Sequence, residues 1–225
     1  MRALPLFVGL VLIMARAIPV QAAERALDLL DPAVSYFADF QVSGDKGRYQ
    51  GKVWHVPGRE KREFSTKGGG QAVLLRRDTD SAYLLKPGGR WFVGLSLSTV
   101  GALAGGLDGL MVERSRQGSD TIAGLATTRY KVSGAGPMGS RFDGSAWFTR
   151  DGIMMAAKGV LTDGRGRKSE VETALSNVTL GHVDAQIFEP PTGWFAMDLR
   201  SVPAERLSQV LETMRPMLEG GGAHQ

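Results

Sequence analysis

Histidine is the residue type in this chain best suited to bind a metal or move a proton, but its spacing supports neither role. His55, His182 and His224 lie too far apart to form a local zinc-binding pattern, and none is part of a His-Glu-x-x-His sequence. The chain has no cysteine, which excludes zinc ribbons, thiol redox chemistry and cysteine nucleophiles. We therefore expect no metal site and no cofactor, and we expect His55 to be a half-exposed residue of a strand.

Three patterns that resemble catalytic or nucleotide-binding motifs lack the features that those motifs require. Ser43 and Lys46 have the Ser-x-x-Lys spacing of penicillin-interacting enzymes, but they precede and occupy a turn, and the companion motifs are absent. The Gly-x-Gly-x-x-Gly sequence at 134–139 contains a proline, so it predicts a loop rather than a dinucleotide site. Glu170 and Glu172 share one strand face, which we expect to be solvated. No catalytic residue is predicted, although a hydrolase site assembled from carboxylates across strands would leave no sequence signature.

The first 22 residues have the pattern of a secretory signal. Met1 and Arg2 form a positive start, and residues 4–14 are an apolar run too short to span a bilayer. Cleavage is expected near Ala22, and a retained interfacial helix is the alternative. No cysteine follows the run, so we expect a soluble periplasmic protein without a lipid anchor.

The charge balance argues against a nucleic-acid partner. Loss of the signal removes Arg2 and Arg16, and the remaining 25 basic and 23 acidic residues give a formal charge of +2. Basic residues gather at 59–62 and 165–168, but acidic residues lie among or beside them and no aromatic pattern accompanies them. We expect both clusters to be solvated strand edges and loop tips.

Alternation of apolar and polar residues predicts a sheet protein. It runs from Val34 to Val42, and a turn at 44–47 leads to a return strand through Tyr49, Val53 and His55. Further strands are expected at 62–66, 71–77, 81–86, 90–93, 124–133, 144–150, 152–162, 168–179 and 185–188. Roughly ten or eleven strands exceed what one flat sheet carries without curling. The predicted fold class is therefore α+β, mainly β: a curled antiparallel sheet that forms an unclosed barrel, with helices capping the concave side.

A glycine-rich stretch at 94–111 interrupts the strand pattern. Val100, Leu103, Leu107 and Leu110 recur there at helical spacing, with four glycines between them. Each glycine weakens a helix by about 1 kcal/mol relative to alanine. The stretch is therefore expected to be a weak helix that is ordered only when its leucines are buried, which is the behaviour of a lid.

Two more helices and a single domain complete the predicted organisation. A short helix is expected at 24–30 and a C-terminal helix at about 203–218, the latter with one apolar stripe. No linker or repeat divides the chain, so one domain is expected over 23–219, followed by a flexible tail at 220–225.

Large apolar side chains on the predicted strands are the candidates for a ligand-binding interior. Half of the side chains on each strand of a curled sheet face inward, and an ordinary packed core is the alternative for any one of them. An acyl chain moved from water into such an interior gains about 0.8 kcal/mol per methylene. The cavity candidates are Phe40, Trp54, Phe64, Leu75, Tyr83, Trp91, Tyr130, Trp147 and Met154, and the lid candidates are Val100, Leu103, Leu107 and Leu110.

Short sequences in a particular order link the chain to a known family. They are Tyr-Phe-Ala-Asp-Phe at 36–40, Gly-Lys-Val-Trp at 51–54, Trp-Phe-Thr-Arg-Asp-Gly at 147–152 and Phe-Glu-Pro-Pro-Thr-Gly at 188–193. With the signal and the leucine-rich interruption, the chain resembles the outer-membrane lipoprotein carrier and receptor superfamily (LolA/LolB-like). The resemblance implies an unclosed barrel capped by helices, whose apolar interior takes the acyl chains of lipoproteins. Carriers of this family have a cavity arginine, whose counterpart here the sequence leaves open.

The predicted function is that of an exported binding protein or carrier for acylated or amphiphilic ligands, such as lipoproteins or lipids. It is expected to be a monomer and not an enzyme. The alternative is a protein-interaction module, a sensor or regulator that engages the ectodomain of a membrane protein on the same scaffold.

Overall fold

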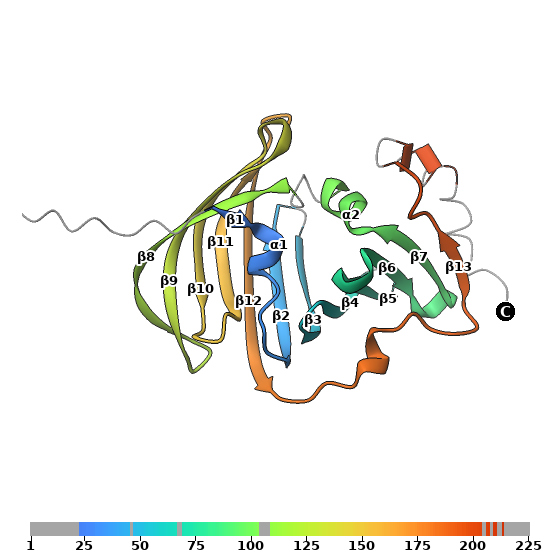
Figure 1. The fold of residues 1–225 in the computed structure, drawn as a ribbon, viewed down its shortest axis with the longest axis horizontal. Coiled ribbons are helices and arrows are strands. Elements are labelled where there is room, and N and C mark those ends of the chain that lie inside the picture. The colour runs from blue at the N-terminus through green and yellow to red at the C-terminus, as the bar shows by residue number, and fades with distance from the viewer. Residues whose placement is uncertain are drawn as a thin grey trace, which may run out of the picture.

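The protein is built on one sheet that curls into a trough and does not close (Figure 1). This computed structural model describes residues 23–45, 47–66, 69–103, 109–203, 206–207, 209–210 and 213. In that part of the chain thirteen strands follow the order β1-β8-β9-β10-β11-β12-β2-β3-β4-β5-β6-β7-β13. The predicted α+β, mainly β class and the unclosed, helix-capped barrel are confirmed.

The strands fall into two runs that are antiparallel throughout. The first run is β2 (Tyr36–Gly44), β3 (Gly47–Val56), β4 (Arg59–Thr66), β5 (Gly69–Arg76), β6 (Ser81–Lys86) and β7 (Trp91–Ser96). The second is β8 (Met111–Ile122), β9 (Leu125–Ala135), β10 (Arg141–Phe148), β11 (Met154–Thr162) and β12 (Lys168–Leu180). β12 pairs with β2 and joins the two runs.

Short strands lie at both edges of the sheet. β1 (Glu24–Arg25) pairs with only the first two residues of β8. After β12 the chain passes through the 3₁₀ turn η5 (Ala185–Phe188) and along one end of the sheet (Figure 1). It then adds β13 (Phe195–Asp198) parallel to β7. An ion-pair network fastens this crossover to the sheet, with Arg76 Nη1 donating to Glu189 Oε2 at 2.7 Å.

Irregular positions in the long strands allow the sheet to curl. Pairing shifts between Arg116 and Gly118 in β8, and again in β10 and β12. In β12 the shift contains Asn177 in the left-handed region (φ 52°), a conformation that asparagine tolerates better than most residues. Asn177 Nδ2 donates to Asp39 Oδ2 on β2 at 2.7 Å, so the bulge is held against the neighbouring strand. Such bulges increase local twist and bend a sheet.

Two helices lie over the same face of the sheet, here called the inner face. α1 (Ala26–Leu29) packs Ala26 and Leu29 against the buried core of β8, β9 and β10. α2 (Leu97–Leu103) packs Val100 against the core formed by β7 and β13. Further 3₁₀ turns occur at η1 (Arg77–Thr79), η2 (Pro87–Gly89) and η4 (Pro137–Gly139).

The structure corrects several expected boundaries. Residues 185–188 form a 3₁₀ turn rather than a strand. Within 94–111, the first residues complete β7, α2 ends at Leu103, and residue 111 already begins β8. β8 and β13 were not anticipated. The signal at 1–22 and the tail at 220–225 lie outside the described residues, as does most of the expected 203–218 helix, of which residues 206–207, 209–210 and 213 are helical.

Candidate functional site

An apolar cavity of about 610 Å³ lies between the inner face of β2 to β5 and the two helices. This volume is within the range of roughly 300–1,000 Å³ typical of small-molecule pockets. Its apolar lining comes from the sheet at Phe40, Val42, Tyr49, Phe64, Val73 and Leu75, and from the helical side at Leu27, Leu30, Leu97, Val100 and Gly101. Thr66 and Gln71 lie at one end, and Glu60, Arg62 and Arg77 lie at the other.

Strand register explains why these side chains share one face. Phe40 on β2 is paired with Gly51 on β3, which is paired with Phe64 on β4. A Cβ atom at Gly51 would collide with the backbone of Glu63, so β3 and β4 approach closely only because this residue is glycine. The two rings flank a position without a side chain. Along β4, Glu60, Arg62 and Phe64 are two residues apart and therefore point to the same side.

The helical wall of the cavity comes from segments far apart in the sequence. Leu27 lies in α1 and Leu30 directly follows it, whereas Leu97 and Val100 lie in α2. Among the described residues, α1 has four helical residues and α2 has seven, and helices of this length are not stable on their own. Their order depends on the apolar contacts that they make with the sheet.

The charged end of the cavity is built around Glu60, which is only 3% exposed. Arg62 Nε donates to Glu60 Oε1 at 2.7 Å, and the Arg62 guanidinium lies 5.3 Å from the centre of the Phe40 ring. Burial alone would raise the pKa of Glu60, but the Arg62 charge and hydrogen bonds outweigh it and lower the pKa from 4.5 to about 2. Glu60 in turn raises the pKa of Arg62. The pair is therefore fully ionised at neutral pH. The expectation that the 59–62 cluster is solvated is wrong for Glu60, whereas the Arg62 side chain is 33% exposed.

His55 ties this charged end to the segment that follows α1. It is fully buried, which corrects the expected half-exposure, and its ring stacks on Tyr36 with centres 5.1 Å apart. Its Nε2 lies 3.0 Å from the backbone oxygen of Pro32, and its Nδ1 lies 3.7 Å from Glu60 Oε2. The imidazole therefore links the sheet to the segment at Pro32, and its role beneath the cavity is structural.

Three of the nine predicted cavity residues line this cavity: Phe40, Phe64 and Leu75. Met154 borders a separate space of about 20 Å³ beside it, next to Tyr36 and Leu30. Val100 is the lid candidate that lines the cavity.

The remaining predicted residues lie elsewhere in the structure. Tyr130 is on the inner face, in the core beneath α1, where its ring packs on Phe148. Trp91 belongs to the core of β7 and β13, and Tyr83 packs on the other face with Phe92 and Trp194.

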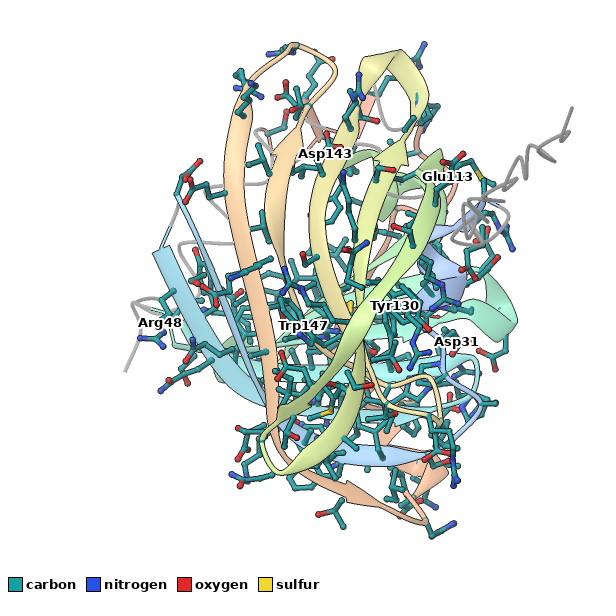
Figure 2. The ribbon with its side chains drawn as sticks, turned by 90° about the vertical axis from the view of Figure 1, so that its left-hand side faces the viewer. Asp31, Arg48, Glu113, Tyr130, Asp143 and Trp147 are labelled. Atoms are coloured by element: carbon teal, nitrogen blue, oxygen red, sulfur yellow. The ribbon has the colours of Figure 1, made fainter. Side chains whose placement is uncertain are left out.

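Two of the three tryptophans on strands, Trp54 and Trp147, point to the outer face. Trp54 packs on Phe37, with Lys61 Nζ 5.4 Å from its ring centre. Trp147 follows Ala146, the partner of Tyr130, and so points the opposite way (Figure 2). Its Nε1 donates to Asp120 Oδ2 at 3.1 Å, with Arg129 and Lys158 over the ring.

The other lid candidates do not line the cavity among the residues that the structure describes. Leu110 is 3% exposed and belongs to the core under α1 with Val112 and Val132. Leu107 and the side chain of Leu103 lie outside what the structure describes.

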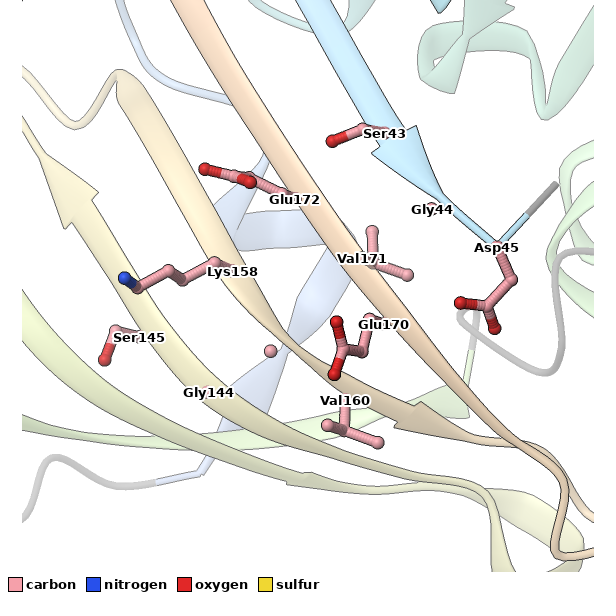
Figure 3. A pocket seen from close by; sticks show the side chains of 11 residues that line it. Ser43, Gly44, Asp45, Gly144, Ser145, Lys158, Val160, Glu170, Val171 and Glu172 are labelled. Carbon is pink, nitrogen blue, oxygen red and sulfur yellow. The ribbon is translucent and has the colours of Figure 1, made fainter. Parts of the chain in front are cut away.

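A second hollow, of about 630 Å³ and called here the outer trough, lies on the outer face of the sheet (Figure 3). Lys158, Glu170 and Glu172 project over it, and its floor includes Gly144 and Gly159, which face each other on β10 and β11. Glu170 and Glu172 share one exposed strand face, as predicted. Six of the eleven residues that line the outer trough have charged or hydroxyl side chains, so it offers a ligand less desolvation than the apolar cavity does. The apolar cavity is the stronger candidate site.

Sequence reasoning missed the cavity residues outside the strand pattern. Leu27, Leu30 and Leu97 come from segments joined to the site only by the tertiary fold, and Arg62 and Arg77 look like surface charges in sequence. Within the described ranges, no group of His, Asp and Glu residues is arranged to hold a metal ion. Nor is any helix there long and apolar enough to cross a membrane.

Comparison with known proteins gives matches to solved structures alone. No family model matches the sequence, and no curated protein does. An uncharacterized conserved protein from Thermus thermophilus is 12% identical, with a TM-score of 0.48 over 77% of this chain and 96% of that one. MucB is 14% identical, with a TM-score of 0.47 over 76% of this chain and 64% of its own. A LolA superfamily protein from Nitrosomonas europaea is 13% identical, with a TM-score of 0.38 over 74% and 98%. At these identities and TM-scores the likeness is at most one of overall fold, and it assigns neither a family nor a role to this chain.

Proposed function

We propose that this protein is an exported, non-enzymatic binding protein or carrier that shelters the acyl chain of a lipid, lipoprotein or other amphiphile in the cavity over β2 to β5. The observation that carries the proposal is the cavity itself, a space of about 610 Å³ with a mainly apolar lining. Apolar side chains around a space of this size face water unless an apolar ligand covers them. An acyl chain within it would gain about 0.8 kcal/mol per methylene removed from water.

Entry of a ligand would require the helical wall to move. Leu97 and Val100 form part of that wall, and they belong to a helix of only seven residues. A short helix held mainly by its apolar contacts is easily displaced. In this proposal α2, whose last residue is Leu103, is the lid, and the N-terminal signal directs the protein out of the cytoplasm.

Mass spectrometry of gently purified protein under native conditions tests the proposal. The expected spectrum contains a bound lipid or lipopeptide at up to one per chain, and that adduct disappears after organic extraction. Protein that is empty in repeated preparations, and that takes up no acyl ligand when one is added, would contradict the proposal.

One observation favours a second candidate, the protein-interaction module. β1 covers only Met111 and Val112, so within the described residues the edge of β8 from Glu113 to Ile122 has no neighbouring strand. An open edge can accept a strand from a partner. Crosslinking in the cell separates the candidates: one stoichiometric membrane-protein ectodomain supports the module, and many lipidated clients support the carrier.

A further inference from the structure

The lining at the charged end of the cavity has two arginines and one carboxylate, and Asp31 lies beside it as an ion-pair partner of Arg77. The three charged lining residues are Glu60, Arg62 and Arg77. Glu60 already accepts a hydrogen bond from Arg62, so Arg77 is left without a carboxylate in the lining. In the described part of the chain the Arg77 guanidinium donates no hydrogen bond. Its nearest carboxylate oxygen is Asp31 Oδ1, 3.7 Å from Nη1. That oxygen already accepts the backbone N–H of Gly58 at 2.9 Å.

An arginine in this position has an unmet need for an acceptor. The Arg77 side chain is only 17% exposed, and its Nη1 is buried. A guanidinium carries five N–H donors, and leaving those of a buried nitrogen such as Nη1 without an acceptor is costly. The other surfaces of the cavity are mainly apolar and cannot supply an acceptor. An anionic group on a bound ligand would satisfy both the charge and the donor geometry.

The length of the cavity suits one acyl chain running away from this end. Glu60, Arg62, Phe64 and Thr66 line it in sequence along β4, a distance of about 20 Å at roughly 3.3 Å per residue. One leaflet of a bilayer's hydrocarbon core is about 15 Å thick, so a chain of membrane length fits between the arginines and the far end at Thr66 and Gln71.

We propose that the ligand is a single-chain amphiphile with a free anionic head group, bound with its head at Arg77 and Arg62 and its tail along β4 and β5. This inference rests on the proposed function and narrows its ligand class. The acyl chains of a lipoprotein are linked through esters or amides and carry no such charge. The geometry therefore favours a free fatty carboxylate or an alkyl phosphate over an acylated protein.

Calorimetric titration tests the inference with three probes of equal chain length: dodecanoate, dodecyl phosphate and dodecanol. The two anions are used at pH 8 below their micelle-forming concentrations, and dodecanol is used at pH 8 below its solubility limit. At least one anion is expected to bind roughly tenfold to a hundredfold more tightly than the alcohol, the range for a charged hydrogen bond. The anion that binds more tightly identifies the head group. Equal affinity for anions and alcohol would overturn this inference and leave the proposed function intact, whereas no binding of any probe would overturn both.

Variants of Arg77 assign the preference to this side chain. Arg77→Gln is expected to lose the preference for the anion while keeping the affinity for dodecanol, and Arg77→Lys is expected to keep most of the preference. The matched control is Arg48→Gln, which removes the same charge from an exposed position on β3 (Figure 2) and is expected to change nothing. Equal weakening of all three probes by Arg77→Gln would indicate a structural role and refute the inference. If that variant does not fold, the wild-type comparison of anion with alcohol still decides.

Discussion

Replacement of Glu60 by glutamine tests whether a buried charge pair forms one end of the cavity. The substitution keeps the shape of the side chain and removes its charge, so the Arg62 guanidinium, whose Nε lies 2.7 Å from Glu60 Oε1, loses its negatively charged partner. Breaking a buried pair by removing one partner typically costs about 3–5 kcal/mol. We expect Glu60→Gln to be the most destabilising single charge removal around the cavity.

The magnitude and its pH dependence follow from the pKa of Glu60. Arg62 and its neighbours overcome burial and lower this pKa from 4.5 to about 2, which corresponds to about 3 kcal/mol of stability at neutral pH. Because the folded pKa is depressed, this stability is fully present above pH 4.5 and is lost as the pH falls toward 2. At pH 3 linkage leaves about 1.5 kcal/mol of it.

The assay is urea denaturation of the wild type and of Glu60→Gln at pH 7 and pH 3. The difference between their free energies of unfolding is expected to fall from about 3 kcal/mol at pH 7 to about 1.5 kcal/mol at pH 3. The control is Glu63→Gln on the same strand, which removes an exposed partner of Lys61 and is expected to cost at most about 1 kcal/mol. A difference for Glu60→Gln that is the same at both pH values would refute the reasoning, because it would arise from packing rather than charge.

Two further predictions concern the cavity and the crossover. Val73→Trp fills the cavity and is expected to weaken acyl binding more than about tenfold in titration, with an unchanged or higher Tm. Val160→Trp, in the hollow on the outer face, is the control. Equal binding by both variants would contradict the assignment of the ligand to the cavity. Arg76→Gln removes the bond to Glu189 and is expected to lower the free energy of unfolding by about 1–3 kcal/mol. The control is Arg200→Gln, which breaks an exposed ion pair and should cost at most about 1 kcal/mol. Equal losses of stability in the two variants would show that the Arg76–Glu189 bond stabilises the fold no more than an exposed ion pair does.

The alternation of apolar and polar residues along single strands predicted most of the sheet, but it did not predict β8. The inner positions of β8 after Val112 include Arg114, which carries no apolar signal. The Arg114 guanidinium lies 5.2 Å from the ring centres of both Tyr130 and Phe148, and its Nε lies 2.8 Å from Glu24 Oε1. These partners come from three other strands. A charged residue on an inner face is therefore invisible to a one-strand pattern.

The candidate site was predictable in kind but only partly in its residues. Phe40 and Phe64 were predicted because each belongs to an apolar strand position, and both line the cavity. Trp54 and Trp147 were assigned inward because of their size, but size does not determine which face a strand residue occupies. On the outer face, the cationic groups of Lys61 and Arg129 lie over these two rings and stabilise them there through cation–π contacts.

The charged end could not be derived from the sequence, because it depends on pairing between strands. Glu60 lies opposite His55 on one side and Leu75 on the other. Only that register brings two arginines and one carboxylate to the end of an apolar space. In sequence, the same residues are part of an ordinary run of surface charges.

Photo-crosslinking with a fatty acid that carries a diazirine on its chain tests whether an acyl chain occupies the cavity. Adducts, located by peptide mass spectrometry, are expected on residues 60–75 and 97–101 around the cavity, and Val73→Trp is expected to remove them. Adducts confined to the outer trough around Lys158, or adducts that Val73→Trp leaves unchanged, would contradict acyl binding in the cavity.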